Sequence, residues 1–192
     1  MKANKLPDMH YLNEALIYDE SCPSYLRWKD RPRSHFNTSR GHLIFKSRSA
    51  NKSAGHKTKS GDGVESYSVK ITQISYPAHR VVFALVNGFD PCDKEVDHID
   101  RNPLNNKADN LRISTRNENA SNKNTPANNT SGRRGVTWCK RTKRWMAQIG
   151  FNKKTVFLGR FKNFEDAVKQ RDKHELALHG EFSNVSSGSL SV

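Results

Sequence analysis

A stretch without charge or hydrophobic periodicity divides this chain into two short parts. Residues 125–131 (TPANNTS) combine Pro, Ala, Asn, Thr and Ser, a composition typical of a linker. Only 34% of the 192 residues are hydrophobic, below the roughly 45–50% of ordinary globular proteins, so each part can bury only a small core. We predict one domain at residues 10–124, a second at 132–182, and a disordered Ser-rich tail at 183–192.

The charge of the chain predicts a polyanionic partner. It has 33 Lys and Arg against 19 Asp and Glu, a net charge of +14 at pH 7. Residues 132–180 alone hold 13 Lys and Arg and 4 Asp and Glu, which is a net charge of +9. Such clustering indicates a dedicated binding module, with nucleic acid as the first candidate partner and an anionic membrane surface as the second.

Two classes of protein are not expected. No apolar run approaches the roughly 20 residues that cross a bilayer, and residues 1–9 lack the apolar region of a signal peptide, so we predict a soluble, cytoplasmic protein. Cys22, Cys92 and Cys139 lie far apart without a CxxC pair, which excludes a disulfide framework and a four-cysteine zinc site.

Hydrophobic periodicity predicts several elements in the first domain. Apolar and polar residues alternate over 67–71, as in a half-buried strand. Over HRVVFALVNG (79–88), apolar residues recur at helical spacing and Gly88 is a natural C-cap. We also expect a short helix at 11–18, strands at 25–28 and 41–46, an exposed hairpin loop at 47–63, and burial of Val81, Val82, Leu85 and Val86.

The segment EVDHIDRNPLNNKADNLRISTRNENASNKN (95–124) carries most of the chemistry. It predicts a strand at 95–99 that ends in Asp97 and His98, a bend rich in turn formers, and a returning strand at 110–113. Thr115 and Glu118 then fit a capping box, which starts a helix. This order would bring together four side chains: Asp97, His98, Asn110 and Asn119.

The same order resembles the HNH nuclease motif, a ββα-metal fold. It is similar to the Asp-His, Asn, Asn variant of phage-type homing endonucleases, and the resemblance extends to HRVVFAL (79–85) and to YDES…LRWKDRP (18–32). The resemblance implies a phage or bacterial enzyme in which His98 is the general base and Asn110 braces the loop. It also implies that Asp97 and Asn119 hold one divalent metal. Because Asn119 stands where the family often has His, oxygen donors favour Mg²⁺ or Mn²⁺ over zinc.

The physical chemistry agrees with these roles. Imidazole, with a pKa near roughly 6.5, suits deprotonation of a water near neutral pH, and a cation suits the charge on a scissile phosphate. An isolated Asp-His pair is weak support, because most histidines are structural. His79 is a competing histidine, but its place at a helix start favours a structural role. Asp100 and Asn102 are explained by turn formation better than by metal binding.

The second domain reads as three strands and a helix. Alternation predicts strands around Val136, over 145–149 and around Leu158, and a helix from Phe164 with Asn163 as N-cap and Gly180 at its end. The pieces RGV, WMAQI, FLGRF and EDAVKQRDKHELALHG make residues 131–182 resemble the ethylene-response-factor (APETALA) DNA-binding domain. That resemblance implies a three-stranded antiparallel sheet backed by one helix, with the polar face of the sheet in the major groove.

Alternation also predicts which residues of this sheet reach DNA. With the apolar residues and Trp138 and Trp145 in the core, Gln148 would meet an adenine edge and Arg144 a guanine or a phosphate. Where the plant family carries arginines after RGV, this chain has Thr137 and Cys139, so the plant target sequence does not transfer. The predicted DNA-binding residues are Arg134, Thr137, Lys140, Arg144, Gln148 and Lys154.

The sequence therefore predicts an α+β protein in which an HNH ββα-metal domain is joined by a short linker to a DNA-binding sheet. The predicted function is a site-preferring homing endonuclease that hydrolyses phosphodiester bonds in double-stranded DNA with a His general base and one divalent metal. No membrane and no obligatory protein partner is predicted. Two alternatives stay open: a transcriptional regulator whose HNH-like domain is a silent scaffold, and an RNA-binding protein, which would need exposed aromatic residues in the basic module.

Overall fold

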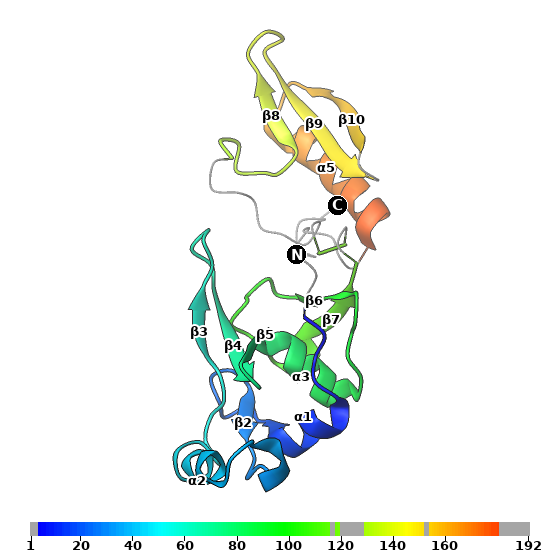
Figure 1. Ribbon diagram of the computed structural model, residues 1–192. Helices are drawn as coiled ribbons and strands as arrows, with labels where there is room; N and C mark the ends of the chain where they lie inside the picture. The colour runs from blue at the N-terminus through cyan, green and yellow to red at the C-terminus, as the bar shows by residue number, and fades with distance from the viewer. Residues whose placement is uncertain (1–3, 116–117, 120–128, 152–153, 181–192) are drawn as a thin grey trace. The chain divides into compact units, whose positions relative to one another are not determined.

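The chain forms two compact units, Met1–Arg116 and Asn117–Val192, in a computed structural model (Figure 1). The structure describes residues 4–115, 118–119, 129–151 and 154–180. Most of the predicted linker and the whole predicted tail lie outside these residues. The division between the units falls shortly before the predicted linker. Helices and strands occur in both units, so the mixed α+β class is confirmed.

The first unit contains three small antiparallel sheets around helix α3. Its elements are α1 (Met9–Ala15), β1 (Leu16–Tyr18), β2 (Leu26–Trp28), η1 (Arg33–His35), α2 (Ser39–Arg48), β3 (His56–Lys59), β4 (Glu65–Ile71), β5 (Ile74–Pro77), α3 (Ala78–Asn87), β6 (Glu95–His98), η2 (Ala108–Asn110) and β7 (Leu111–Ser114). The sheets are β1-β2, β3-β4-β5 and β6-β7. Helix α3 contacts all three of them and lies beside the β6-β7 hairpin (Figure 1).

Helix α3 supplies much of the core of this unit. Its predicted C-cap is confirmed, because Gly88 adopts the left-handed conformation with a φ of 78°. Val81 and Val82 are fully buried, and Val96 and Leu111 pack into the same core from the hairpin. Val86, predicted to be buried, is 47% exposed because it lies on the outer side of the last helical turn.

Three local predictions in this unit are wrong or incomplete. Residues 41–46 belong to helix α2 instead of a strand, because the Thr38 side chain caps the helix by accepting from the Gly41 N–H at 3.0 Å. Residues 47–63 are not all loop, since β3 pairs there with β4. The helix expected at 11–18 ends at Ala15, and the chain continues as β1 against β2.

The second unit is built on an antiparallel sheet with the strand order β10-β9-β8. Its elements are β8 (Val136–Cys139), β9 (Arg144–Phe151), β10 (Lys154–Phe161) and α5 (Phe164–His179). Helix α5 contacts all three strands, and Val136, Ala147 and Ala167 form the buried centre between sheet and helix. No helix in the described parts of the chain is long and apolar enough to cross a membrane.

Exposed aromatic rings on this sheet depart from the prediction. Trp138, expected in the core, is 46% exposed on the edge strand β8, where its ring packs edge-to-face against Trp145 with ring centroids 5.2 Å apart. Phe151 and Phe157 are exposed as well. Trp145 does pack against Phe164 of α5, at 4.8 Å between ring centroids.

A buried charge network joins α5 to the segment before β8. Arg133 pairs with Asp172, and Arg171 pairs with Glu175. Arg171, Asp172 and Glu175 are all buried. Burial, and next the charge of Arg133, lower the pKa of Arg171 to about 10. Arg133, which also lies 3.8 Å from Glu175, anchors the segment before β8 to the helix, and removing one partner would leave a buried charge uncompensated.

Gly135 is required where this segment enters β8. Its φ is +76°, and a Cβ built there would lie 2.3 Å from the Gln148 carbonyl oxygen and 2.9 Å from Arg171 Nε. We expect Gly135→Ala to destabilise the second unit by more than about 2 kcal/mol, measured by denaturant unfolding followed through tryptophan fluorescence. Gly132→Ala is the matched control, since its φ is +74° but nothing lies within 4 Å of the added Cβ. Equal costs for the two variants would show that the close approach to Gln148 is unimportant.

Candidate active site

The β6-β7 hairpin presents Asp97 and His98 at the end of β6. Asp97 pairs in register with Arg112, and His98 pairs with Leu111. Both Asp97 and His98 are buried. Arg112 donates from Nε and Nη2 to Asp97 Oδ2, at 3.3 and 3.2 Å, which orients this carboxylate.

Asn110 holds the loop between the two strands in place. Its Oδ1 accepts from the Asp100 N–H at 3.0 Å, and its Nδ2 donates to Asp100 Oδ1 at 2.9 Å and to the Asn105 carbonyl oxygen at 2.8 Å. Burial acts to raise the pKa of Asp100, but hydrogen bonds from Asn105, the Asn102 N–H and Asn110 outweigh it and hold the pKa below its ordinary value. The loop is therefore fixed by side chains and by an ionised carboxylate.

Asn106 selects one nitrogen of the His98 ring. Asn106 is 1% exposed, and its Oδ1 lies 3.0 Å from His98 Nε2. Its Nδ2 donates to the Ser24 carbonyl oxygen at 3.3 Å, so the amide oxygen must face the imidazole. His98 Nε2 then donates, and in the neutral ring the basic lone pair is on Nδ1.

His79 contacts His98 at the start of α3. The two ring centroids are 4.9 Å apart in an edge-to-face arrangement. Burial, then the charges of His98 and Arg80, lower the pKa of His79 to about 3, so its ring is neutral near pH 7. A neutral ring can pack against His98 without repelling an imidazolium there, which supports the structural role predicted for His79.

Arg80 fixes the segment that leads into β6. Its buried guanidinium pairs with Asp90 at 2.8 Å, and it donates to the carbonyl oxygens of Cys92 at 2.7 Å and Lys94 at 3.2 Å. Asp90 also accepts from the Leu6 N–H at 3.0 Å. These bonds tie β6 to α3 and to the N-terminal segment, and so position Asp97 and His98.

The predicted metal ligands are only partly placed. Asn119 is helical and half-buried, but it belongs to the second unit, so its pairing with Asp97 stays a prediction. In the described parts of the chain, no group of three or more His, Cys, Asp and Glu could hold a metal ion. A metal here would need donors of another kind, such as an amide oxygen and water, beside the Asp97 carboxylate.

The outward face of the second sheet carries several of the predicted DNA-binding residues. Thr137 lies opposite Met146, which lies opposite Arg160, and Gln148 lies opposite Phe157. The Arg160 guanidinium is 5.2 Å from the centre of the Phe157 ring. Among the predicted residues, Thr137, Lys140 and Lys154 are exposed, whereas Arg134, Arg144 and Gln148 are half-buried.

Sequence reasoning missed three residues of these sites. Asn106 lies in the predicted bend between the two strands, and nothing in an Asn-rich loop distinguishes the one amide that contacts a histidine 8 residues away. Arg112 was foreseeable, because a hairpin that returns at residues 110–113 places it opposite Asp97. Arg160 was missed because a β-bulge between Phe157 and Gly159 shifts the alternation of β10.

Comparisons with known proteins agree with the hairpin geometry. Residues 76–121 match a family described as HNH endonuclease. The chain is 35% identical over 105 residues to "Protein 3.8" of Escherichia phage T7. The aligned residues cover 55% of this chain and 86% of that protein. It is 40% identical over 67 residues to "Uncharacterized HNH endonuclease L560" of Acanthamoeba polyphaga mimivirus, covering 34% of this chain and 36% of that protein. No solved structure matches the chain significantly. The chain therefore belongs to the same family as protein 3.8 of phage T7 and carries an HNH endonuclease domain.

Proposed function

We propose that this protein is a site-preferring, metal-dependent DNA endonuclease of the homing type. The observation that carries the proposal is the buried pair of Asp97 and His98, in which Asn106 directs the basic nitrogen of His98 and Arg112 orients Asp97. This pair lies inside the segment that matches the HNH endonuclease family.

His98 is the proposed general base. Its Nδ1 takes a proton from a water molecule, whose oxygen then bonds to the phosphorus of the scissile phosphodiester as the bond to the leaving oxygen breaks. Asn110 keeps the loop closed by its bonds to Asp100 and Asn105, so that the ring is held in one orientation. Asn106 keeps the ring in the tautomer that this step requires.

The donor atoms proposed for the metal fit a hard cation. A carboxylate from Asp97 and an amide oxygen from Asn119, completed by water, match the preferences of Mg²⁺ and Mn²⁺ and provide neither the thiolate nor the imidazole donors typical of zinc. Such an ion supplies positive charge against the scissile phosphate and the leaving oxygen.

The second unit is the proposed site-selecting module for double-stranded DNA. Its outward face combines Thr137, Gln148 and Arg160 on neighbouring strands, and its resemblance to the ethylene-response-factor domain suggests that this face enters the major groove. The net charge of +9 over residues 132–180 supports binding to phosphate. No obligatory protein partner is part of this proposal.

Supercoiled plasmid provides the direct test. The purified full chain should relax or linearise the plasmid with Mg²⁺ or Mn²⁺ and leave it intact with EDTA. DNA binding without cleavage under any divalent cation would favour the regulator with a silent scaffold. Preferential binding to single-stranded RNA would favour the RNA-binding alternative. That alternative needs exposed aromatic residues, and Trp138 and Phe157 are exposed.

Asn106 offers a test of how His98 is held. Asn106→Ala should lower the cleavage rate by about tenfold, because the ring loses the acceptor that fixes its tautomer, while the Kd for DNA stays unchanged. Asn106→Asp keeps an acceptor for the His98 ring but adds a negative charge beside it. Because this charge favours the protonated ring, the acid limb of the pH–rate profile should move to higher pH. Identical pH profiles for Asn106→Asp and the parent would contradict this role for Asn106.

Lys140 and Gln148 separate phosphate contacts from base contacts. Lys140→Ala should weaken binding to all DNA sequences alike and lower the salt slope of log affinity by roughly 0.9, since a phosphate contact releases a counterion. Gln148→Ala should leave the slope unchanged and cost about 1 to 3 kcal/mol on a preferred site, found first by selection from random duplexes. If Gln148→Ala weakens both kinds of DNA equally and lowers the slope, Gln148 contacts the backbone.

A further inference from the structure

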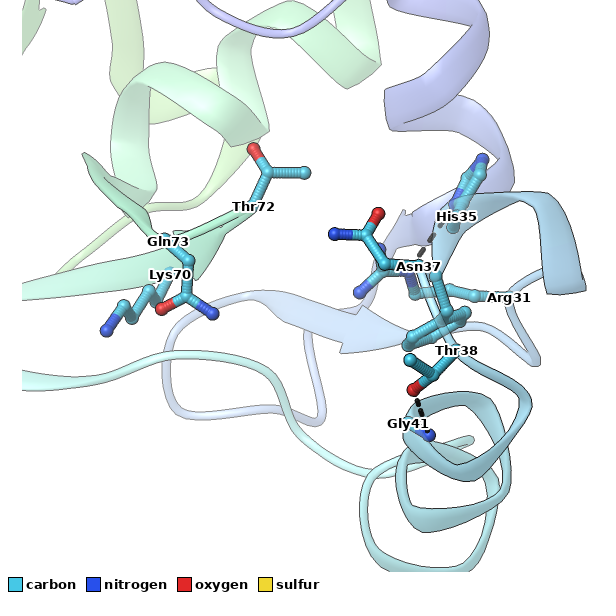
Figure 2. A pocket seen from close by; sticks show the side chains of 9 residues that line it. Arg31, His35, Asn37, Thr38, Gly41, Lys70, Thr72 and Gln73 are labelled. Carbon is cyan, nitrogen blue, oxygen red and sulfur yellow. Dashed lines mark hydrogen bonds between the residues drawn. The ribbon is translucent and has the colours of Figure 1, made fainter.

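The first unit contains a polar cavity that shares no residue with the β6-β7 hairpin. Its volume is about 420 Å³. Figure 2 shows Arg31, Asn37 and Thr38 on one wall, from the segment that leads into α2. Lys70, from the end of β4, and Gln73, from the turn between β4 and β5, lie on the facing wall. Arg31 and Lys70 give the cavity positive charge, and among the described residues no Asp or Glu lines it.

Arg31 is the buried cation of this cavity. It is 8% exposed, and four aromatic rings surround its guanidinium, with centroids 4.6–5.5 Å from Cζ: Tyr11, Trp28, Phe36 and Phe45. Its Nη2 donates to the Tyr11 hydroxyl, and its Nε donates to His35 Nδ1 at 3.4 Å. In the parts of the chain that the structure describes, no carboxylate forms an ion pair with Arg31.

The other arginines that are buried in the described parts of the chain do have carboxylate partners. Arg80 pairs with Asp90, and Arg171 pairs with Glu175. Asp30, the neighbour of Arg31 in the sequence, pairs with Lys46 at 3.1 Å, and Glu14 binds Nε2 of His35, whose Nδ1 accepts from Arg31. Arg31 thus differs from them in having aromatic faces and a hydroxyl in place of an anion.

A buried guanidinium without a counter-charge is unfavourable, and the aromatic faces offset only part of the cost of removing it from water. That burial lowers the pKa of Arg31, although the neighbouring Tyr11 acts against it, and an arginine stays charged even so. The cavity therefore has a positive charge that an anion entering it would neutralise.

The rest of the cavity supplies the donors that a tetrahedral anion needs. Lys70 is exposed on the wall that faces Arg31. Asn37 and Thr38 precede the first turn of α2, a helix of 10 residues whose N-terminal end favours negative charge. With Arg31, the cavity is thus lined by one buried cation, one exposed cation and several neutral donors.

We propose that this cavity binds a phosphate group, with Arg31 as its buried counter-charge and Lys70 as the second cation. The phosphate belongs either to the backbone of DNA or to a free nucleotide. The first source rests on the proposed nuclease function, whereas phosphate binding in the cavity does not.

Thermal melting of the full chain tests the binding of phosphate. At matched pH and ionic strength in EDTA, inorganic phosphate at about ten times its Kd should raise the Tm by about 3 to 6 °C over chloride. Lys70→Ala and Arg31→Lys should lose most of this shift, whereas Lys59→Ala, an exposed lysine of β3 outside the cavity, should keep it. If Arg31→Lys does not fold, Lys70→Ala alone decides. No shift in the parent protein, or a full shift in Lys70→Ala, would overturn the proposal.

DNA affinity in EDTA then distinguishes the two sources. If the phosphate is part of DNA, Lys70→Ala lowers the salt slope by roughly 0.9, and inorganic phosphate weakens DNA binding by the parent more than by Lys70→Ala. If it is part of a free nucleotide, the slope is unchanged and a deoxynucleoside monophosphate raises the Tm more than inorganic phosphate does. Plasmid cleavage is scored separately, so a failure of the nuclease assignment leaves the phosphate-dependent Tm shift intact.

Discussion

Replacing His98 by alanine should lower the rate of plasmid cleavage by about 10²- to 10⁴-fold and leave the Kd for duplex DNA nearly unchanged. The base acts on the proton of the attacking water in the transition state, and the proposed DNA-binding residues lie on another sheet. Single-turnover cleavage and binding measured in EDTA separate the two effects.

His10→Ala is the matched control for this variant, because His10 is an exposed histidine of α1 whose side chain is 82% accessible. It should cleave like the parent protein. The melting temperature of His98→Ala needs to be measured too, since His98 is buried and bonds to Asn106. Retained cleavage by a folded His98→Ala protein would remove His98 from the mechanism.

Asp97→Ala should reduce metal-dependent cleavage by about 10²- to 10³-fold, because the carboxylate proposed to hold the cation is lost. Titration of cleavage with Mg²⁺ and Mn²⁺ is the measurement. Asp97→Asn is the companion variant, since it keeps the shape of the side chain and an oxygen that accepts from Arg112 but removes the charge. Asp93→Ala, at an exposed carboxylate of the segment before β6, should titrate like the parent. An unchanged metal dependence in both Asp97 variants would show that Asp97 is not a ligand.

The predicted hairpin and the helix α3 show what local pattern can establish. The strands at 95–98 and 111–114 and the helix over 78–87 formed where periodicity and Gly88 placed them, because burial of Val81, Val82, Val96 and Leu111 in one core satisfies the local pattern as well. The three strands of the second unit also lie where alternation predicted them. Most of the side chains that repeat with the period of these elements are buried, with Val86 and Trp138 as exceptions.

Helix α2 and Trp138 show where local pattern fails. The sequence predicts a strand over residues 41–46, but these residues form α2, which the Thr38 side chain caps. Leu43 and Ile44 are 64% and 44% exposed there, so burial of apolar side chains does not decide the conformation of this segment. Trp138 has the alternation of a core residue, yet β8 is an edge strand whose outer end α5 covers incompletely. Whether a side chain is buried depends on which other elements pack over it, and the sequence of its own helix or strand does not encode those elements.

The sequence by itself determined that Asp97 and His98 end a strand and that a bend leads to a returning strand, because spacing and turn residues are local properties. The structure places Asn110 at the end of η2, directly before β7, and not on the returning strand as predicted. The tertiary structure decided the contacts between segments far apart in the chain. Asn106 meets His98 only because Ser24, 82 residues away, orients its amide. Arg31 is buried among four aromatic rings that come from residues 11, 28, 36 and 45. Hydrogen bonding and desolvation depend on neighbours in space, and only the packed chain provides them.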